Sequence, residues 1–243
     1  MLNDATILPI VKLMRNIASG MHHKRIFMKK LHIPYIKTLD TADIYSAQDI
    51  LEESGKLDVI EKLNWADKFP YRPITYFFIG RSSEALFIRF SVKGTMLKAV
   101  YTKDLSPVHE DSCVEFFCMP VDGEKYTNFE FNCIGTCDAS RRTSRKVDVV
   151  KLTEAEMKTI ERLPSIGAKA FKEMEGMFEW ELTVKIPFKL MGIDSENLPE
   201  KILGNFYKCA DDTDSKHFVT WAPIHTEKPD FHRPEFFGEL YFD

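Results

Sequence analysis

The sequence lacks the features that mark several large classes of protein. No apolar run approaches the ~20 residues that a membrane-spanning helix needs, so no membrane partner is expected. Gly-rich phosphate loops, nucleophile elbows, H-E-x-x-H pairs and EF-hand loops are all missing, which removes the chemistries that short motifs carry. With 11 Gly and 12 Pro in 243 residues, the composition also excludes collagen-like and low-complexity chains.

A surplus of positive charge is missing as well. The formal net charge is −4 and the pI is near 6.0, with lysine and arginine spread along the chain. Proteins that follow a phosphate backbone concentrate basic residues on one surface, so nucleic acid is not an expected partner. The densest basic stretch, residues 141–146, has serine and threonine interleaved and predicts a solvated loop.

Cysteine is present but follows no ligand or disulfide pattern. The five cysteines are an odd number at irregular spacing, without a C-x-x-C pair or histidines at zinc-finger intervals. The pattern favours buried free thiols in a reducing compartment. No metal or disulfide is needed for stability at this length, because a single domain buries roughly three quarters of its unfolded surface.

The first thirty residues read differently from the rest. The short apolar patch at 7–14 contains Lys12, and a basic segment follows it where an export signal would need small residues. We therefore expect no export signal and a cytoplasmic location. Met28 also reads naturally as a chain start, and a misassigned start would leave a periplasmic or secreted location open. The expected division is a poorly ordered leader at 1–30 and one folded domain at 31–243.

From residue 74 onward, apolar and polar residues alternate with a period of two, which is typical of half-buried antiparallel strands. Further segments of this kind are expected at 74–79, 86–92, 97–101, 113–119, 126–133, 178–186, 203–209, 217–221 and 236–242. A capping box at 153–156 starts one predicted helix that ends at Pro164, and residues 46–63 predict another, interrupted at Gly55. So many strands and so few helices predict an all-β protein, an antiparallel β-sandwich with one or two short peripheral helices.

One predicted hairpin gathers polar side chains on a single face. Pairing its strands about the turn at 121–124 sets these residues opposite each other: Glu115 and Glu130, Cys113 and Asn132, Phe117 and Asn128. The other face carries phenylalanine and valine and is expected to be core. Two carboxylates directly across an antiparallel pair repel, so something must offset the cost.

Three arrangements would offset the repulsion between Glu115 and Glu130. The two carboxyls could be a retaining glycosidase pair ~5 Å apart, they could accept hydrogen bonds from sugar hydroxyls, or they could bond to Arg or Lys from a neighbouring strand. The residues alone leave all three open.

Two features of the C-terminal third stand out. Trp221 lies at a predicted strand end, where its indole either stacks on a sugar ring or covers the end of the sandwich. The acidic turn at 211–214 either holds a structural calcium ion through hard oxygen ligands or is a solvated loop.

Three segments together resemble a known family: residues 106–117, 126–135 and 227–240. They are similar to the bacterial family 9 carbohydrate-binding-module-like proteins, a branch of the DOMON-like sandwiches, over residues 31–243. The resemblance implies a β-sandwich that binds a neutral plant-type or other oligo- or polysaccharide without catalysis, in carbohydrate catabolism, sometimes with structural calcium. Such modules accompany glycoside hydrolases, and we expect no hydrolase domain within these 243 residues.

Carried over by position, the resemblance implies a ligand-binding set: Glu115, Glu130, Asn132, Asn205, Tyr207 and Trp221. His109 joins this set at a position that is often aromatic in the family. No catalytic or metal-ligating residue and no other cofactor is implied, and the expected partner is a saccharide.

Two other functions fit the same residues. The chain could be a cryptic glycoside hydrolase that uses Glu115 and Glu130, which requires both carboxyls in an open cleft. It could also be a sandwich that has lost sugar binding and serves as a protein-interaction module, which an exposed apolar patch in place of a polar cup would favour.

Overall fold

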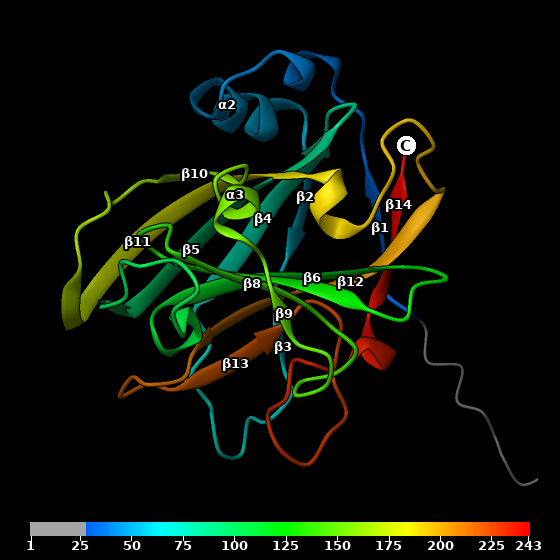
Figure 1. The fold of residues 1–243 in the computed structure, drawn as a ribbon. Coiled ribbons are helices and arrows are strands. Elements are labelled where there is room, and N and C mark those ends of the chain that lie inside the picture. Colours follow the sequence, from blue (N-terminus) through cyan, green and yellow to red (C-terminus); the bar gives the residue numbers. More distant parts are fainter. Residues whose placement is uncertain (1–27) are drawn as a thin grey trace, which may run out of the picture.

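Two β-sheets face each other in the computed structural model, which describes residues 28–243 (Figure 1). One has nine strands in the order β1-β14-β12-β6-β7-β8-β9, with β13 beside β12 and β3 beside β13; the other has five in the order β10-β11-β5-β4-β2. Among the named strands of residues 28–243, β1 with β14 is the parallel pair, and the remaining pairs are antiparallel. The predicted β-sandwich is confirmed.

The nine-stranded sheet contains β1 (Lys30–Ile33), β3 (Lys62–Leu63), β6 (Cys113–Pro120), β7 (Tyr126–Asn132), β8 (Cys137–Arg142), β9 (Val150–Lys151), β12 (Lys201–Ala210), β13 (His217–Thr220) and β14 (Gly238–Phe242). The five-stranded sheet contains β2 (Lys56–Val59), β4 (Ile74–Arg81), β5 (Ala85–Ala99), β10 (Glu161–Pro164) and β11 (Phe171–Pro187). Within residues 28–243 the α-helices are α2 (Ile44–Ser54) and α3 (Glu154–Met157).

Aromatic side chains from both sheets fill the space between them. Phe77 on β4 stacks on Phe206 of β12 with ring centroids 4.2 Å apart, and Phe116 of β6 lies against the other side of the same cluster. Because side chains alternate along a strand, the neighbours of these residues point to the opposite face of each sheet. All five cysteines are buried and free, as the sequence predicts.

The register predicted for the β6–β7 hairpin is confirmed. Glu115 pairs with Glu130, and Cys113 pairs with Asn132. The face expected to be core is fully buried, including Phe129. Glu115 and Glu130 therefore lie side by side on the outer face of the nine-stranded sheet.

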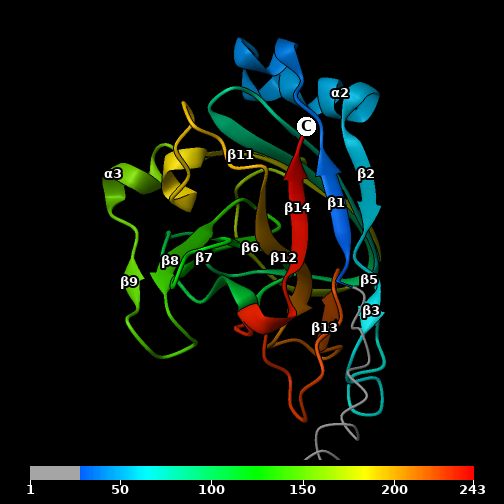
Figure 2. The ribbon, with the colours of Figure 1, turned by 90° about the vertical axis from the view of Figure 1, so that its right-hand side faces the viewer.

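Helix α2 packs at one end of the five-stranded sheet, on its outer face (Figure 2). Its N-cap Asp43 accepts a hydrogen bond from the Ser46 amide at 2.7 Å. Leu51 packs with Phe87 of β5. The predicted helix at 46–63 is confirmed as far as Gly55, and strand β2 follows directly.

The second predicted helix is much shorter than expected. The capping box between Thr153 and Glu156 is present, but α3 ends at Met157. Residues 161–164 form β10 and pair with β11 instead. The helical spacing was misleading because Met157 and Ile160 reach the core, whereas Leu163 lies on the half-buried edge strand β10.

The fold begins before residue 31. Residues 1–27, where most of the expected leader falls, lie outside the described part of the chain. Lys29 contacts the Asp58 carboxylate at 3.2 Å, and Lys30 begins β1. The boundary at residue 30 therefore lies inside the sandwich. Within residues 28–243 no helix has the length and apolar character needed to cross a membrane.

Trp221 is a core residue, which corrects the prediction that its indole stacks on a sugar. Its exposed fraction is 0%, and its ring meets Phe206 edge to face at 5.6 Å. The indole nitrogen donates to Asp58 Oδ2 at 2.9 Å. Gly238 lies so close that an added Cβ would be 2.4 Å from the ring. The indole is enclosed by protein, with the Lys29 ammonium 4.6 Å from the ring centre, so the ring has no free face for a sugar.

Replacing Trp221 tests this assignment. We expect Trp221→Ala to lower the free energy of unfolding by about 3–5 kcal/mol, because it empties a large buried volume and removes the donor to Asp58 Oδ2. Urea unfolding followed by circular dichroism measures the change. Tyr45→Ala, at a side chain that is 69% exposed, is the control and should change stability by less than about 0.5 kcal/mol. A loss below about 1 kcal/mol for the tryptophan variant would contradict the core assignment.

Candidate functional site

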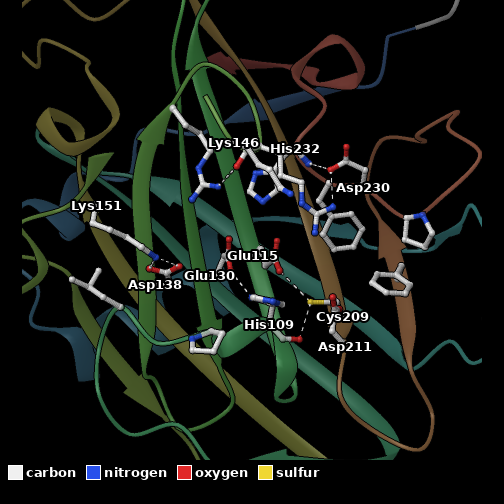
Figure 3. A pocket seen from close by; sticks show the side chains of 17 residues that line it. His109, Glu115, Glu130, Asp138, Lys146, Lys151, Cys209, Asp211, Asp230 and His232 are labelled. Atoms are coloured by element: carbon white, nitrogen blue, oxygen red, sulfur yellow. Dashed lines mark hydrogen bonds and ion pairs between the residues drawn. The ribbon is translucent and has the colours of Figure 1, made fainter. Parts of the chain in front are cut away.

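A pocket of about 380 Å³ lies on the outer face of the nine-stranded sheet (Figure 3). Its lining is formed by Leu105, Pro107, His109, Glu115, Glu130, Asp138, Arg142, Arg145, Lys146, Lys151, Cys209, Asp211, Phe218, Pro229, Asp230, Phe231 and His232. Most of these side chains are polar or charged. The apolar contribution comes from prolines, one leucine and two phenylalanines at the edge.

The strands supply the pocket floor and the loops supply its walls. Glu115, Glu130 and Asp138 come from β6, β7 and β8, at positions whose chain neighbours face the core. The wall segment at 229–232 is fixed because Phe231 stacks on Tyr207 of β12 with centroids 4.3 Å apart. The Tyr207 hydroxyl also donates to the Phe231 carbonyl at 3.1 Å.

Glu130 is held as an ionised acceptor. Its side chain is only 5% exposed, and it accepts a hydrogen bond from Asn128 at 3.0 Å. The His109 ring approaches its other oxygen at 3.5 Å. Burial alone would raise the pKa of Glu130, but the interaction with His109 keeps that pKa below its usual value. The same contact raises the pKa of His109, because the Glu130 carboxylate stabilises the protonated ring.

Glu115, directly opposite, has a contrasting environment. It is 2% exposed, and its Oε1 accepts from the Cys209 thiol at 3.1 Å. Burial, then the neighbouring Cys209 and Glu130, raise the pKa of Glu115 well above its usual value. The sequence left open a bond from these glutamates to Arg or Lys of a neighbouring strand, and that prediction is wrong. Within residues 28–243, Glu130 contacts His109 and Glu115 contacts the Cys209 thiol instead.

The opposite side of the pocket is basic, and here the prediction of a solvated loop at 141–146 is wrong in part. Arg142 ends β8 and is 7% exposed. Its guanidinium donates to the Ser140 hydroxyl at 3.1 Å and to the Arg145 carbonyl at 3.0 Å. Arg142 is thus buried at the pocket, whereas Arg145 and Lys146 line the pocket but are exposed, as a solvated loop predicts.

Three other basic residues line the pocket, and two of them have an acidic neighbour. Lys151 pairs with Asp138 across β8 and β9. Arg145 contacts Asp230 at 3.4 Å. Lys146 has no acidic partner within residues 28–243. The pocket thus contains four Lys or Arg and five Asp or Glu side chains, a nearly balanced set of donors and acceptors.

The sequence matches the model of carbohydrate-binding family 9 over residues 47–242, most of the chain. The chain belongs to this family. A carbohydrate-binding protein from Bacteroides uniformis ATCC 8492 is similar to it at 30% identity and a TM-score of 0.83, over 89% of this chain and 100% of that one. A family 9 module from Caldicellulosiruptor kristjanssonii, in complex with cellotriose, shares the fold at 10% identity and a TM-score of 0.50. The match covers 88% of this chain and 93% of that one. No curated protein matches the sequence.

In this family 9 protein, three of the seven residues expected at the site line the pocket: His109, Glu115 and Glu130. The others have structural contacts, which corrects their assignment. Asn132 is 0% exposed and donates to Asp111 at 3.0 Å. Asn205 is also fully buried, and it accepts from the Ala222 amide at 2.9 Å.

Tyr207 and Trp221 complete the corrected set. The Tyr207 ring lies beneath Phe231 and is 0% exposed, so it supports the wall of the pocket without lining it. Trp221 lies in the core, as described above. Asn205 and Tyr207 do point to the outer face, as strand alternation predicts, but the segment that follows β13 covers that part of the sheet.

Sequence reasoning missed several residues of the site. Asp138 and Arg142 were overlooked because β8 was not predicted as a strand. Asp230, Phe231 and His232 lie in the segment 227–240 that carries the family resemblance, and that motif was the available signal.

The acidic turn at 211–214 already holds a cation. The Lys98 ammonium contacts Asp212 Oδ2 at 2.6 Å and the Asp212 carbonyl at 2.6 Å. The Lys98 contacts involve only Asp212, and the structural calcium implied by the resemblance stays a prediction.

His232 supplies a test of the pocket wall. Burial lowers its pKa from the usual 6.5 to about 4, and its Nδ1 lies 2.9 Å from the Tyr126 hydroxyl. Because the unfolded chain binds the proton more readily, this residue makes stability fall as pH drops from about 7 towards 4. We expect His232→Gln to remove this pH dependence, so that the stability of the wild type falls relative to that of the variant by about 2 kcal/mol between pH 7 and pH 4.5.

Urea unfolding of both proteins at intervals between pH 4.5 and 7.5 measures the difference. Above pH 7 the difference should be constant, since both folded and unfolded histidine are neutral there. A difference that does not change between pH 7 and pH 4.5 would contradict the assignment of a buried neutral imidazole.

Proposed function

We propose that this family 9 protein binds a neutral saccharide in the pocket on the outer face of the nine-stranded sheet. The observation that carries the proposal is the pocket itself, in which four basic and five acidic side chains converge with almost no net charge. Sugar hydroxyls both donate and accept hydrogen bonds, so they can satisfy such a mixed set without bringing a charge of their own. Carbohydrate binding by the relatives supports the same ligand class.

Charged side chains that are already positioned make strong contacts to hydroxyl groups. Glu130 is fixed by Asn128 and His109 and offers an acceptor. Arg142 and Arg145, held on the opposite wall, offer donors in a planar arrangement. Hydrogen bonds to ionised groups are worth about 1.5–3 kcal/mol each, and preorganisation reduces what binding loses in entropy.

An apolar surface for the sugar ring comes from Phe231 and Phe218, in place of Trp221. Both phenylalanines line the pocket, and they meet edge to face at 5.9 Å. They are 8% and 9% exposed, so the contact they offer is narrow. A pocket of about 380 Å³ lies at the small end of the ~300–1,000 Å³ range of ligand pockets, which favours a short saccharide or a chain end.

The placement of the two glutamates favours binding over hydrolysis. Glu115 and Glu130 are directly paired across β6 and β7 and share one face of the sheet. They therefore lie on the same side of any bound sugar, whereas the two carboxyls of a glycosidase flank the bond that is cleaved.

A polar pocket also favours sugar over a protein partner. The role in polysaccharide catabolism implied by the resemblance stays a prediction.

Calorimetry with glucose, cellotriose and xylotriose at millimolar concentration tests the proposal. We expect at least one of them to bind the wild type, and Glu130→Gln to weaken that binding by about 10- to 100-fold, because a charged acceptor becomes neutral. Glu179→Gln is the matched control. Its carboxylate pairs with Lys93 on the five-stranded sheet and is 54% exposed, so binding should not change.

Circular dichroism melting of both variants ensures that folded proteins are compared. The proposal is overturned if none of the three saccharides binds the folded wild type, or if Glu130→Gln binds as tightly as Glu179→Gln. Reducing-sugar release from cellotriose during the same incubation would instead favour hydrolysis.

A further inference from the structure

Three potential metal ligands converge at the floor of the pocket. Cys113 and Glu115 lie two residues apart on β6 and therefore point to the same face. Cys209 on β12 is paired directly with Cys113. The Glu115 carboxylate oxygen is 3.1 Å from Cys209 Sγ and 3.9 Å from Cys113 Sγ, and the three ligand atoms all lie within 4.8 Å of one another.

The environment of Glu115 indicates a missing positive charge. The side chain is 2% exposed and faces a second carboxylate, Glu130, across the strand pair. Within residues 28–243 it forms no ion pair, while Glu130 has His109. A buried carboxyl group is costly without a cation or a proton, and repulsion from a neighbouring carboxylate adds to that cost.

The remaining cysteines provide a contrast within the same chain. Cys118, Cys133 and Cys137 pack in the apolar core between the two sheets. Cys113 and Cys209 belong to the cluster on the outer face, beside the pocket. Packing of small apolar side chains accounts for the first group, but it does not account for a carboxyl group between two thiols.

We propose that Cys113, Cys209 and Glu115 bind a zinc-class divalent cation through two thiolates and one carboxylate. Zinc–sulfur and zinc–oxygen bonds of ~2.3 and ~2.0 Å place tetrahedral ligands ~3.5–3.8 Å apart, and the spacings here bracket those values. Thiolates favour this class of metal over calcium and magnesium. The site differs from the calcium expected at the acidic turn in both place and chemistry.

The metal site lies beside the pocket, and this determines where the free coordination position of the ion would point. Glu115 and Cys209 line the pocket (Figure 3). Cys113, paired with Cys209, is fully buried and is not part of the lining. Three protein ligands leave a tetrahedral ion with one position for water or a ligand oxygen. That position would face the pocket, where a hydroxyl group of a bound molecule can reach it. The metal site stands whether or not a sugar binds.

Titration of the full chain with Co²⁺, after reduction and removal of metal under anaerobic conditions, tests the proposal. We expect one equivalent of Co²⁺ to produce thiolate-to-cobalt charge-transfer bands in the near ultraviolet and tetrahedral bands in the visible, and Zn²⁺ to abolish them. Cys209→Ser and Cys113→Ser should weaken binding by more than about tenfold, as loss of even an outer-shell partner typically does.

Cys118→Ser is the matched control, because Cys118 lies on the same strand, is 1% exposed and faces the core. It should keep the cobalt spectrum of the wild type. Zn²⁺ should also raise the melting temperature of the wild type and of Cys118→Ser but not of Cys209→Ser, which separates metal binding from folding. The proposal is overturned if the reduced wild type gives no charge-transfer bands, or if Cys209→Ser retains them.

Discussion

The pairing of β6 with β7 is the constraint on which both the core and the pocket depend. Its register places phenylalanines between the sheets and glutamates on the outer face. A slip of one residue would exchange the two sets, burying Glu115 among aromatic rings and exposing Phe116. The free energy gained by burying the aromatic face therefore offsets the repulsion between the two carboxyl groups that the same register brings together.

The structure resolves that conflict by giving the two carboxyls different partners. Glu130 retains its charge because His109 and Asn128 approach it, and Glu115 is left among thiols at the pocket floor. The asymmetry arises from the strands on either side. β7 is followed by β8, with its polar network, whereas β6 is next to β12, which brings Cys209. One sheet thus provides a charged wall and a thiol-rich floor within a single cavity.

Strand alternation made the sandwich, the core and the hairpin register predictable from sequence, because these depend on a period of two. The site was only partly predictable. Trp221 was misjudged because strand position does not reveal what covers it, and here Gly238 and Phe206 enclose the ring. Arg142 was missed because a charged residue facing a pocket has the same local pattern as one facing water. The wall at 229–232 depends on contacts between segments far apart in the chain.

Strand β1 has a consequence for where the chain can be shortened. It covers β14 along four residue pairs, from Lys30↔Glu239 to Ile33↔Phe242, and it lies before the stretch that the family model matches. A chain trimmed to residue 47 would leave the backbone of β14 open along its length and would uncover the core beneath Leu31. Residues that precede the matched stretch therefore supply the edge strand of the sheet and part of its hydrophobic cover.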